Sequence, residues 1–382
     1  MEFHIWDFLN KDFQITTNLS KKMNERMGGL IKDRISEISN KLKIPPARLY
    51  EYFVYNSHEI PLDTLHKLSR ILNLPLLDIE KSIITYKQKH VPEKNSIKNP
   101  NLPIKVDPYF TSLVANLFFD GSVPENGKGT YYNQKNEKIM SDFIKKVNNI
   151  FGDVNYSLRK DHRGVLSCRL PRLIGEICGE IYQVESFGTF DAEIPKILLS
   201  LNNEHKIAFI LTAIIDEGSI AYDGSIIFGV SNKVLAEGVN NLCQEIGLKT
   251  GGIKTKKNSQ HYYFYINSKQ ELSKVINIFS KKYPFISLNY KKDRLEKALQ
   301  IKGINSEHTS KFFKYRVAKV TKKLKKKPCT INELSNKLTL PPRTLRRYMY
   351  KLIKKGDVRR KKVGSEYLYY LENFSNASLN SL

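Results

Sequence analysis

The sequence is poor in cysteine and lacks the segments that direct a chain to a membrane. Cys168, Cys178, Cys243 and Cys329 lie far apart with no Cys-x-x-Cys pair, which excludes a usual structural zinc site and a disulfide framework. No uncharged apolar run reaches about 18 residues, and the N-terminus MEFHIWDFLN has no basic stretch followed by an apolar one. These absences predict a soluble, cytoplasmic protein with no membrane partner, associated with the nucleoid in a prokaryote.

Acidic residues are also scarce relative to basic ones. The chain of 382 residues carries 63 Lys and Arg against 38 Asp and Glu, a net charge of +25, which favours polyanionic partners and above all nucleic acid. Residues 301–382 hold 21 basic and 5 acidic side chains, so +16 of the excess lies there. Apolar residues interleave with these charges, which favours a folded basic module over a disordered tail.

One short motif occurs near both ends of the chain. Residues 35–52 (ISEISNKLKIPPARLYEY) and 331–348 (INELSNKLTLPPRTLRRY) are identical at ten of eighteen positions. In each copy, apolar residues at helical spacing precede a Pro-Pro pair, and the second proline suits the first turn of a new helix. The motif predicts two helices joined by a short turn.

This pattern resembles a helix-turn-helix, whose second helix enters the DNA major groove. The groove-facing helices would be about 45–56 and 341–355, and the first copy continues as further helices of an all-helical module. In the second copy Gly364 could turn a two-stranded ribbon resembling a winged helix. Protein contacts are the alternative role for both copies. The candidate DNA-binding residues are Arg48, Tyr50, Tyr52, Arg343, Arg346, Arg347, Lys351, Arg359, Arg360, Lys361 and Lys362.

Two apolar segments in the middle of the chain end in the same way. YFTSLVANLFFDGSV and, 97 residues later, KIAFILTAIIDEGSI each place an acid before a glycine: Asp120 before Gly121, and Glu217 before Gly218. The glycines predict helix C-terminal caps. An acid at the negative end of a helix is locally unfavourable, so the repeated placement predicts a bound divalent cation. The alternative is an exposed helix-end carboxylate without a ligand.

These two segments resemble the LAGLIDADG motif of homing endonucleases, and the resemblance covers residues 106–302. Strand-like runs at 129–134 and 225–230, each followed by an amphipathic helix, fit the same plan. The resemblance implies an α+β fold: a pseudo-twofold αββαββα core in which Ala115, Thr212, Gly121 and Gly218 lie at the interface of the motif helices and two sheets form a saddle on DNA. The chain departs from the family pattern at Asn116, Phe118, Phe119 and Thr212.

The full expected organisation has six parts. They are a lead segment (1–30), a helix-turn-helix domain (31–90), a linker (91–105), the two-repeat core (106–302), a basic winged-helix-like domain (303–373) and a tail (374–382). Since one chain supplies both repeats, a monomeric pseudo-dimer is expected.

The resemblance also implies a chemistry. Asp120 and Glu217 would hold Mg²⁺ or another divalent cation over the scissile phosphates, with Lys291 or Lys292 beside them. Further saddle candidates are Arg159, Lys160, Arg169, Lys254, Lys256 and Lys257, with Tyr131, Tyr132, Tyr262 and Tyr263 able to contact phosphates. The first hypothesis is therefore a site-specific endonuclease acting on double-stranded DNA. The alternatives are a transcription regulator that keeps the fold without cleavage and, less favoured, an RNA-processing or intron maturase protein.

Overall fold

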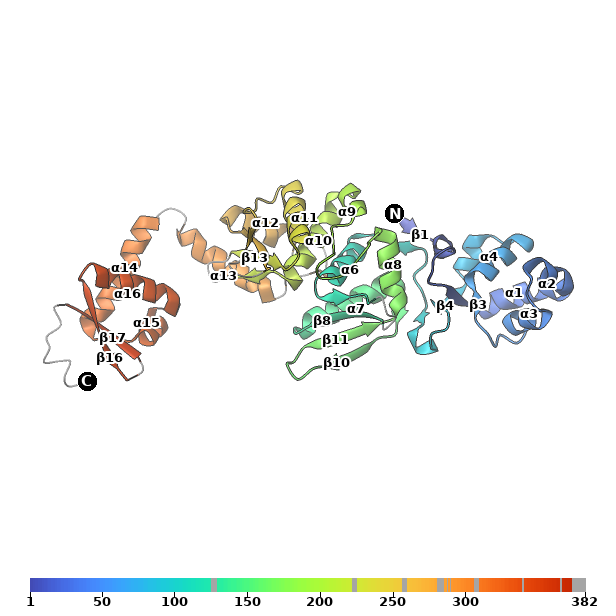
Figure 1. Ribbon diagram of the computed structural model, residues 1–382, viewed down its shortest axis with the longest axis horizontal. Coiled ribbons are helices and arrows are strands. Elements are labelled where there is room, and N and C mark those ends of the chain that lie inside the picture. The colour runs from blue at the N-terminus through green and yellow to red at the C-terminus, as the bar shows by residue number, and fades with distance from the viewer. Residues whose placement is uncertain are drawn as a thin grey trace. The chain divides into compact units, whose positions relative to one another are not determined.

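The protein is an α+β structure of two compact units, Met1–Gln300 and Ile301–Leu382 (Figure 1). The computed structural model describes residues 1–124, 129–221, 225–255, 260–279, 285–286, 288, 290–305, 309–338, 340–364 and 366–372. Each unit has its own hydrophobic core. Within the described ranges, no helix is both long and apolar enough to cross a bilayer.

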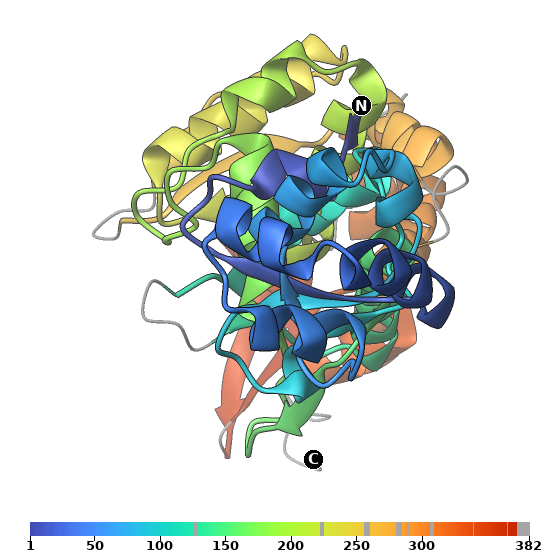
Figure 2. The same ribbon diagram turned by 90° about the vertical axis from the view of Figure 1, so that its right-hand side faces the viewer.

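The N-terminal part of the first unit mixes helices and strands (Figure 2), so the expectation of an all-helical module is wrong. Its strands β2 and β4 pair with each other because both are rich in β-branched residues, which favour extended backbone. The elements are β1(Glu2–Phe3), η1(Ile5–Phe8), β2(Ile15–Leu19), α1(Lys21–Lys32), α2(Ile35–Leu42), α3(Pro46–Phe53), β3(Ile60–Pro61), α4(Leu62–Ile71), α5(Leu76–Glu80) and β4(Ile83–Gln88).

Residues 91–105, expected to be a linker, take part in two sheets. They contain η2(Glu93–Asn95), β5(Ile97–Lys98) and β6(Ile104–Lys105). β6 pairs with β1, whereas β5 pairs with both β4 and β9(Asp153–Val154), completing a sheet of order β3-β2-β4-β5-β9. Ile97 and Ile104 are each 1% exposed or less, which explains why this polar stretch is held in place.

Apart from β9, which pairs with β5, the central part repeats one order of elements, α-β-β-α-β-β-α. The first repeat is α6(Pro108–Phe118), β7(Gly121–Ser122), β8(Thr130–Gln134), α7(Glu137–Phe151), β10(Ser157–Lys160), β11(Leu166–Leu170) and α8(Arg172–Tyr182). After α9(Lys196–Ser200), the second is α10(Asn203–Asp216), β12(Ser219–Ile220), β13(Ile226–Val230), α11(Lys233–Glu245), β14(Lys254–Thr255), β15(Tyr262–Ile266) and α12(Lys269–Phe279). Their antiparallel sheets, β10-β11-β8-β7 and β12-β13-β15-β14, have equivalent strand orders.

Matching residues start the matching helices of the two repeats. The side chain of Asn136 accepts hydrogen bonds from backbone N–H groups at the start of α7, and Asn232 does the same for α11. Such caps satisfy donors that have no partner within the helix. The repeated Asn caps explain locally why the two helices begin at equivalent places.

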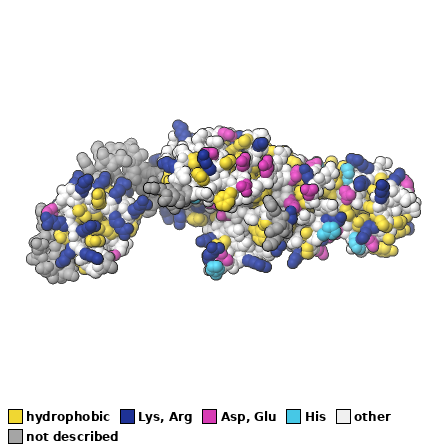
Figure 3. Space-filling view, in the orientation of Figure 1, with side chains coloured by type: hydrophobic (Ala, Val, Ile, Leu, Met, Phe, Trp, Pro, Cys, Tyr) yellow, Lys and Arg dark blue, Asp and Glu magenta, His cyan; other side chains and the backbone are white. Residues whose placement is uncertain are grey.

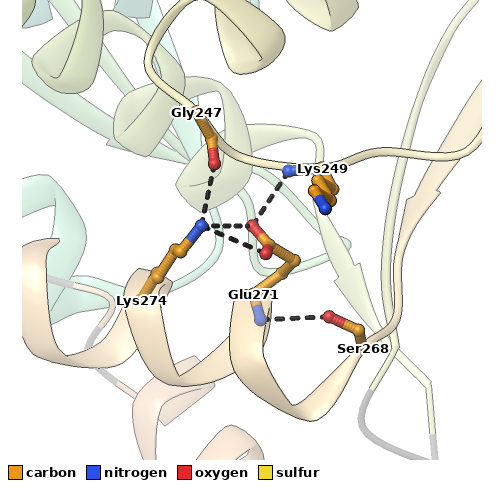
Figure 4. Close-up of polar contacts among 5 residues, drawn as sticks. All are labelled: Gly247, Lys249, Ser268, Glu271 and Lys274. Atoms are coloured by element: carbon orange, nitrogen blue, oxygen red, sulfur yellow. Dashed lines mark hydrogen bonds and ion pairs between the residues drawn. The ribbon is translucent and has the colours of Figure 1, made fainter.

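A buried carboxylate fixes α12 to the loop that follows α11 (Figure 4). Glu271, 1% exposed, accepts from Lys249 N at 2.9 Å and from Lys274 Nζ at 3.1 Å. Lys274 Nζ also donates to Gly247 O at 2.8 Å. A buried charge with these partners ties the last helix of the second repeat to the turn before β14.

The second unit contains helices and one hairpin, and its helix pair repeats a detail of the N-terminal pair. Its elements after α13(Tyr290–Asn305), which crosses the unit boundary, are α14(Thr309–Lys326), α15(Ile331–Leu338), α16(Pro342–Lys354), β16(Val358–Val363) and β17(Glu366–Leu371). Ser39 Oγ donates to Ile44 O at 2.6 Å, and the matching Ser335 Oγ donates to Leu340 O at 2.7 Å. The two motif copies therefore make their turns with the same side-chain hydrogen bond.

Candidate metal and nucleic-acid site

The helices α6 and α10 pack against each other through a seam that includes polar side chains. Ser112 Oγ and Thr212 Oγ1 lie 2.6 Å apart, and Asn116 Nδ2 donates to Asp216 Oδ2 at 2.8 Å. Ala115 and Thr212 are both fully buried. Two of the residues that depart from the LAGLIDADG pattern, Asn116 and Thr212, therefore each make a hydrogen bond across the seam.

The glycines that follow the two acids serve close packing, which corrects their predicted role as helix C-terminal caps. Neither Gly121 nor Gly218 has a positive φ. A Cβ on Gly121 would lie 2.5 Å from Leu117 Cα, and one on Gly218 would lie 2.5 Å from Ile214 O. At each position the chain turns directly from helix into strand, back against the last helical turn, and only glycine leaves room for it.

We predict that Gly121→Ala destabilises the protein, because the new methyl group would overlap backbone atoms that cannot rotate away. The expected loss in the free energy of unfolding is about 1 to 3 kcal/mol. Gly29→Ala in α1 is the control, because a Cβ there meets nothing within 4 Å; it should stabilise the helix by about 0.5 to 1 kcal/mol. Urea unfolding of both variants measures the difference, and equal midpoints would contradict the packing argument.

The acids at the ends of the two helices share one electrostatic environment. Burial raises the pKa of Asp120 to about 6, and the positive charge of Lys291 opposes that shift. Burial, followed by the negative charge of Asp120, raises the pKa of Glu217 to about 7, again opposed by Lys291. The two carboxylates are thus close enough for one to hinder ionisation of the other.

Lys291, at the start of α13, lies at the C-terminal end of α10. Its Nζ donates to Ile214 O at 2.8 Å, to Gly218 O at 2.5 Å and to Ile215 O. The side chain is buried, and burial lowers its pKa to about 8 against the opposing charges of the nearby acids. Lys292 instead forms an ion pair with Glu296 on the same helix at 3.8 Å. Of the two candidate lysines, the structure brings Lys291 to the acids.

Sequence reasoning missed a third acid, Asp216, which precedes Glu217. It accepts hydrogen bonds from Asn116 Nδ2 and from Tyr132 Oη, each at 2.8 Å. Burial and the negative charge of Asp120 raise its pKa to about 8. An acid within the last turn of an otherwise apolar helix, in IIDEG, was the available indication.

Two side chains of β8 reach the acids. Gln134 Nε2 donates to Asp120 Oδ2 at 3.2 Å, a contact that the sequence did not suggest. Tyr132, considered as a phosphate contact, is fully buried and donates to Asp216 instead. Strand alternation explains both roles, because Tyr132 and Gln134 are two residues apart and lie on the helix-facing side of the sheet.

The opposite face of the first sheet carries polar and basic side chains. Arg169 pairs with Tyr131 and with Ser157 in the ladders of β8 and β10, and its guanidinium lies 5.9 Å from the Tyr131 ring. Arg159 is two residues after Ser157 in β10, so its side chain lies on the same face. Lys160 lies on the other face and forms an ion pair with Glu137 of α7 at 3.3 Å. Tyr131, Arg159 and Arg169 therefore share a surface from which Lys160 is excluded.

The second sheet presents a matching outer face. Lys254 pairs with Tyr263, and its Nζ lies 5.2 Å from the Tyr265 ring. Tyr262 pairs with Val230 and Thr255 and directly precedes Tyr263 in β15. Because neighbouring side chains of a strand point to opposite faces, Tyr262 lies on the face of the sheet opposite to Tyr263. Lys256 and Lys257 lie outside the described residues. The residues brought together on this face are Lys254, Tyr263 and Tyr265.

The two helix pairs differ in what they expose. On α16 the apolar residues Leu345, Met349 and Leu352 are buried, and on β16 the basic residues face solvent; the exposed set is Arg343, Arg346, Arg347, Lys351, Arg359, Arg360, Lys361 and Lys362. Figure 3 shows Lys and Arg side chains gathered on the visible face of this unit.

The N-terminal helix pair exposes fewer of its candidate residues. On α3, Arg48 pairs with Glu51 at 2.8 Å, and Tyr52 is 7% exposed and belongs to the core. Tyr50 is half-buried beside Tyr55.

Among the described residues, no group of three or more His, Cys, Asp or Glu side chains is arranged to hold a metal ion. Asp120 and Glu217 offer two carboxylates, a small protein donor set that suits Mg²⁺ because this ion keeps several other oxygen ligands. Burial is the main cause of the raised pKa of both acids, and the negative charge of Asp120 adds to it at Glu217; a bound cation would favour the ionised form of each.

Comparison with known proteins gives structural similarities only. No family model and no curated protein matches the sequence. The structure of I-DmoI in complex with DNA and Mn is 18% identical, covering 46% of this chain and 98% of its own, with a TM-score of 0.35. The N-terminal LAGLIDADG domain of DUF199/WhiA is 8% identical over 45% and 83%, with a TM-score of 0.31. Full-length DUF199/WhiA from Thermatoga maritima is 11% identical over 67% and 93%, with a TM-score of 0.35. At these values the similarities assign neither family nor activity.

Proposed function

We propose that this chain binds double-stranded DNA and cuts it as a divalent-cation-dependent endonuclease of the LAGLIDADG type. The observation that carries the proposal is the pair of carboxylates, Asp120 and Glu217, at equivalent ends of the packed helices α6 and α10, each interacting with the charge of Lys291. Isolated helix-end acids would lie in solvent and would not change each other's pKa.

Four residues of the chain have separate roles in this proposal. Asp120 and Glu217 would hold the cation, which supplies an activated water and neutralises charge on the phosphate when bound. Gln134 keeps the Asp120 carboxylate oriented through its hydrogen bond. Lys291 donates hydrogen bonds to the carbonyl groups at the C-terminal end of α10. That end of the helix is partially negative, so an acid there without a nearby cation would be unfavourable. The positive charge of Lys291 also allows three acids to lie together.

DNA would lie across the outer faces of the two sheets. Tyr131, Arg159 and Arg169 on one sheet and Lys254, Tyr263 and Tyr265 on the other supply cations and hydroxyl groups for phosphate contacts. We propose α2–α3 as a helix-turn-helix and α15–α16 with the β16–β17 hairpin as a winged helix, with α16 in a major groove. The solvent-exposed arginines of α16 make this the stronger of the two DNA-reading candidates.

The proposed function is tested by selecting bound DNA from a random pool and incubating the selected duplexes with Mg²⁺. We expect both strands of a selected sequence to be cut, and chelation of the cation to stop the reaction. Duplexes that are bound tightly but stay intact over a range of Mg²⁺ and Mn²⁺ concentrations would contradict the enzymatic assignment.

We predict that cleavage accelerates as the pH rises from about 6 to 8 at subsaturating Mg²⁺. The pKa values of Asp120 and Glu217 are raised to about 6 and about 7, so both acids are protonated in part at the lower end of this range, and a protonated carboxyl holds a cation poorly. Raising Mg²⁺ should move the profile to lower pH, because cation and proton compete. A profile unaffected by Mg²⁺ would show that these acids do not bind it.

The basic face of α16 should contribute strongly to the salt dependence of binding. Replacing Arg343, Arg346 and Arg347 by Ala should reduce the slope of log K against log salt by roughly 0.9 for each lost phosphate contact. Lys233→Ala is the control, because Lys233 lies on α11, on the helix side of the second sheet, and pairs with Glu237. An unchanged slope in the triple variant would remove α16 from the DNA interface.

A DNA-binding regulator without cleavage is the second candidate. It is favoured by the engagement of Lys291, whose ammonium group is already bonded to three backbone carbonyls and is not directed at a substrate. Occupancy at promoters, together with intact selected duplexes in the Mg²⁺ assay, would favour this candidate over the endonuclease.

A further inference from the structure

Asp216 connects the two repeats through hydrogen bonds that the proposed chemistry does not use. Its Oδ2 accepts from Asn116 Nδ2 and its Oδ1 accepts from Tyr132 Oη, each at 2.8 Å. Both donors belong to the first repeat, whereas Asp216 is the last residue of α10 in the second. Both carboxylate oxygens of Asp216 are therefore bonded across the seam.

A buried lysine determines how Asn116 is oriented. Lys146, 3% exposed, donates to Ser112 Oγ at 2.7 Å and to Asn116 Oδ1. The carbonyl oxygen of Asn116 faces Lys146, which donates to it, and the amide nitrogen of Asn116 faces Asp216, which accepts from it. Lys146 thus donates to Asn116, and Asn116 donates to Asp216. The chain of hydrogen bonds therefore needs an acceptor at position 216. We call Lys146, Asn116, Tyr132 and Asp216 the seam cluster.

The seam cluster joins the segments that carry the two catalytic candidates. Asp216 immediately precedes Glu217, and Asn116 lies one helical turn before Asp120. Tyr132 immediately precedes the two residues of β8 that bind Asp120: Asn133 N donates to Asp120 O at 2.9 Å, and Gln134 Nε2 donates to its carboxylate. A shift of α10 along α6 would break both hydrogen bonds of Asp216 and would move Glu217 relative to Asp120.

We propose that Asp216 is a positioning residue, which sets the separation of the Asp120 and Glu217 carboxylates by tying the end of α10 to the first repeat. This inference rests on the proposed endonuclease function. It also gives Asn116 a purpose at a seam where the LAGLIDADG pattern has no amide. Since a cation must contact both carboxylates at once, an error of about 1 Å in their separation would weaken its binding and slow cleavage.

The test exchanges the two partners of the central hydrogen bond. In Asp216→Asn only one side-chain oxygen remains for the two donors, Asn116 Nδ2 and Tyr132 Oη, that each bind a separate carboxylate oxygen in the wild type. In Asn116→Asp two carboxylates face each other. The double variant Asn116→Asp/Asp216→Asn restores complementarity, since Asp at 116 accepts from Lys146 and from the new amide, whose oxygen still accepts from Tyr132. Net charge equals that of the wild type.

Two measurements on full-length variants decide the proposal. Urea unfolding should show lower midpoints for both single variants and a midpoint near the wild-type value for the exchanged pair. With a selected duplex, Asp216→Asn should cut at least about tenfold more slowly and require more Mg²⁺, and the exchanged pair should recover most of the rate. Glu237→Gln on α11, at a half-exposed side chain, is the control for the change from acid to amide.

The outcomes separate this inference from the function on which it rests. If the wild type cuts and Asp216→Asn cuts equally fast at every Mg²⁺ concentration, the positioning role is wrong while the endonuclease stands. If the single variants lose rate and the exchanged pair does not recover it, the charge at position 216 is needed in place of the hydrogen bond, and the proposal is again overturned. A wild type that cuts no selected duplex contradicts the function itself.

Discussion

Glu217→Gln and Asp120→Asn should each slow DNA cleavage by at least about a thousandfold, equivalent to roughly 4 kcal/mol of lost transition-state stabilisation. Each change keeps the shape of the side chain and removes one of the two carboxylates that would hold the cation. Binding to a selected duplex should stay equal or become tighter, because an acid that repels phosphate has been removed. Rates with saturating Mg²⁺ and affinities in Ca²⁺ provide the two measurements.

The control for these variants is Glu237→Gln, which removes an acid of α11 whose side chain is 47% exposed and pairs with Lys233 in the same helix. It should cut at the wild-type rate. Normal cleavage by both active-site variants would show that Asp120 and Glu217 are structural acids and would leave only the DNA-binding part of the account.

Lys291→Met should have the second largest effect, on both stability and cleavage. The change leaves three backbone carbonyls at the end of α10 without their donor and removes the cation that offsets Asp120 and Glu217. We expect the free energy of unfolding to fall by at least about 3 kcal/mol, because unsatisfied buried acceptors and unpaired buried charges are both costly. Cleavage should be lost with it.

Lys292→Met is the matched control, one residue further along α13. The Lys292 side chain is 38% exposed, and its ion pair with Glu296 is a long one between neighbouring turns of one helix. Exposed pairs of this kind contribute only about 0.3 to 0.5 kcal/mol. Urea unfolding and cleavage of both variants should therefore differ sharply, and equal behaviour would show that the buried position of Lys291 has no functional consequence.

Features that depend on local sequence could be predicted without coordinates. The helix pairs α2–α3 and α15–α16 begin and end near the predicted places because helical spacing and the Pro-Pro pair act within a few residues. The helices that end just before Asp120 and Glu217 could be found because apolar runs stop at an acid and a glycine in both repeats. The strand runs at 129–134 and 225–230 correspond to β8 and β13.

Features that depend on distant partners could not be predicted. Lys160 follows Arg159 in the sequence but lies on the other face of its strand, since a shift of one residue reverses the side-chain direction. The purpose of Asp216 is visible only when Asn116 and Tyr132, 100 and 84 residues away, are brought beside it. β2 and β4 were missed for the same reason, because each is stabilised by pairing with a strand far along the chain.

The central claim is that Asp120 and Glu217 together hold a cation on DNA. The most direct test is the crystal structure of the full chain with a selected duplex and Mn²⁺, using anomalous scattering to locate the ion. We expect an anomalous peak within bonding distance of both carboxylates and of a backbone phosphate oxygen. A complex in which Mn²⁺ is absent from this position, with the two carboxylates turned apart or bonded only to protein groups, would contradict the account.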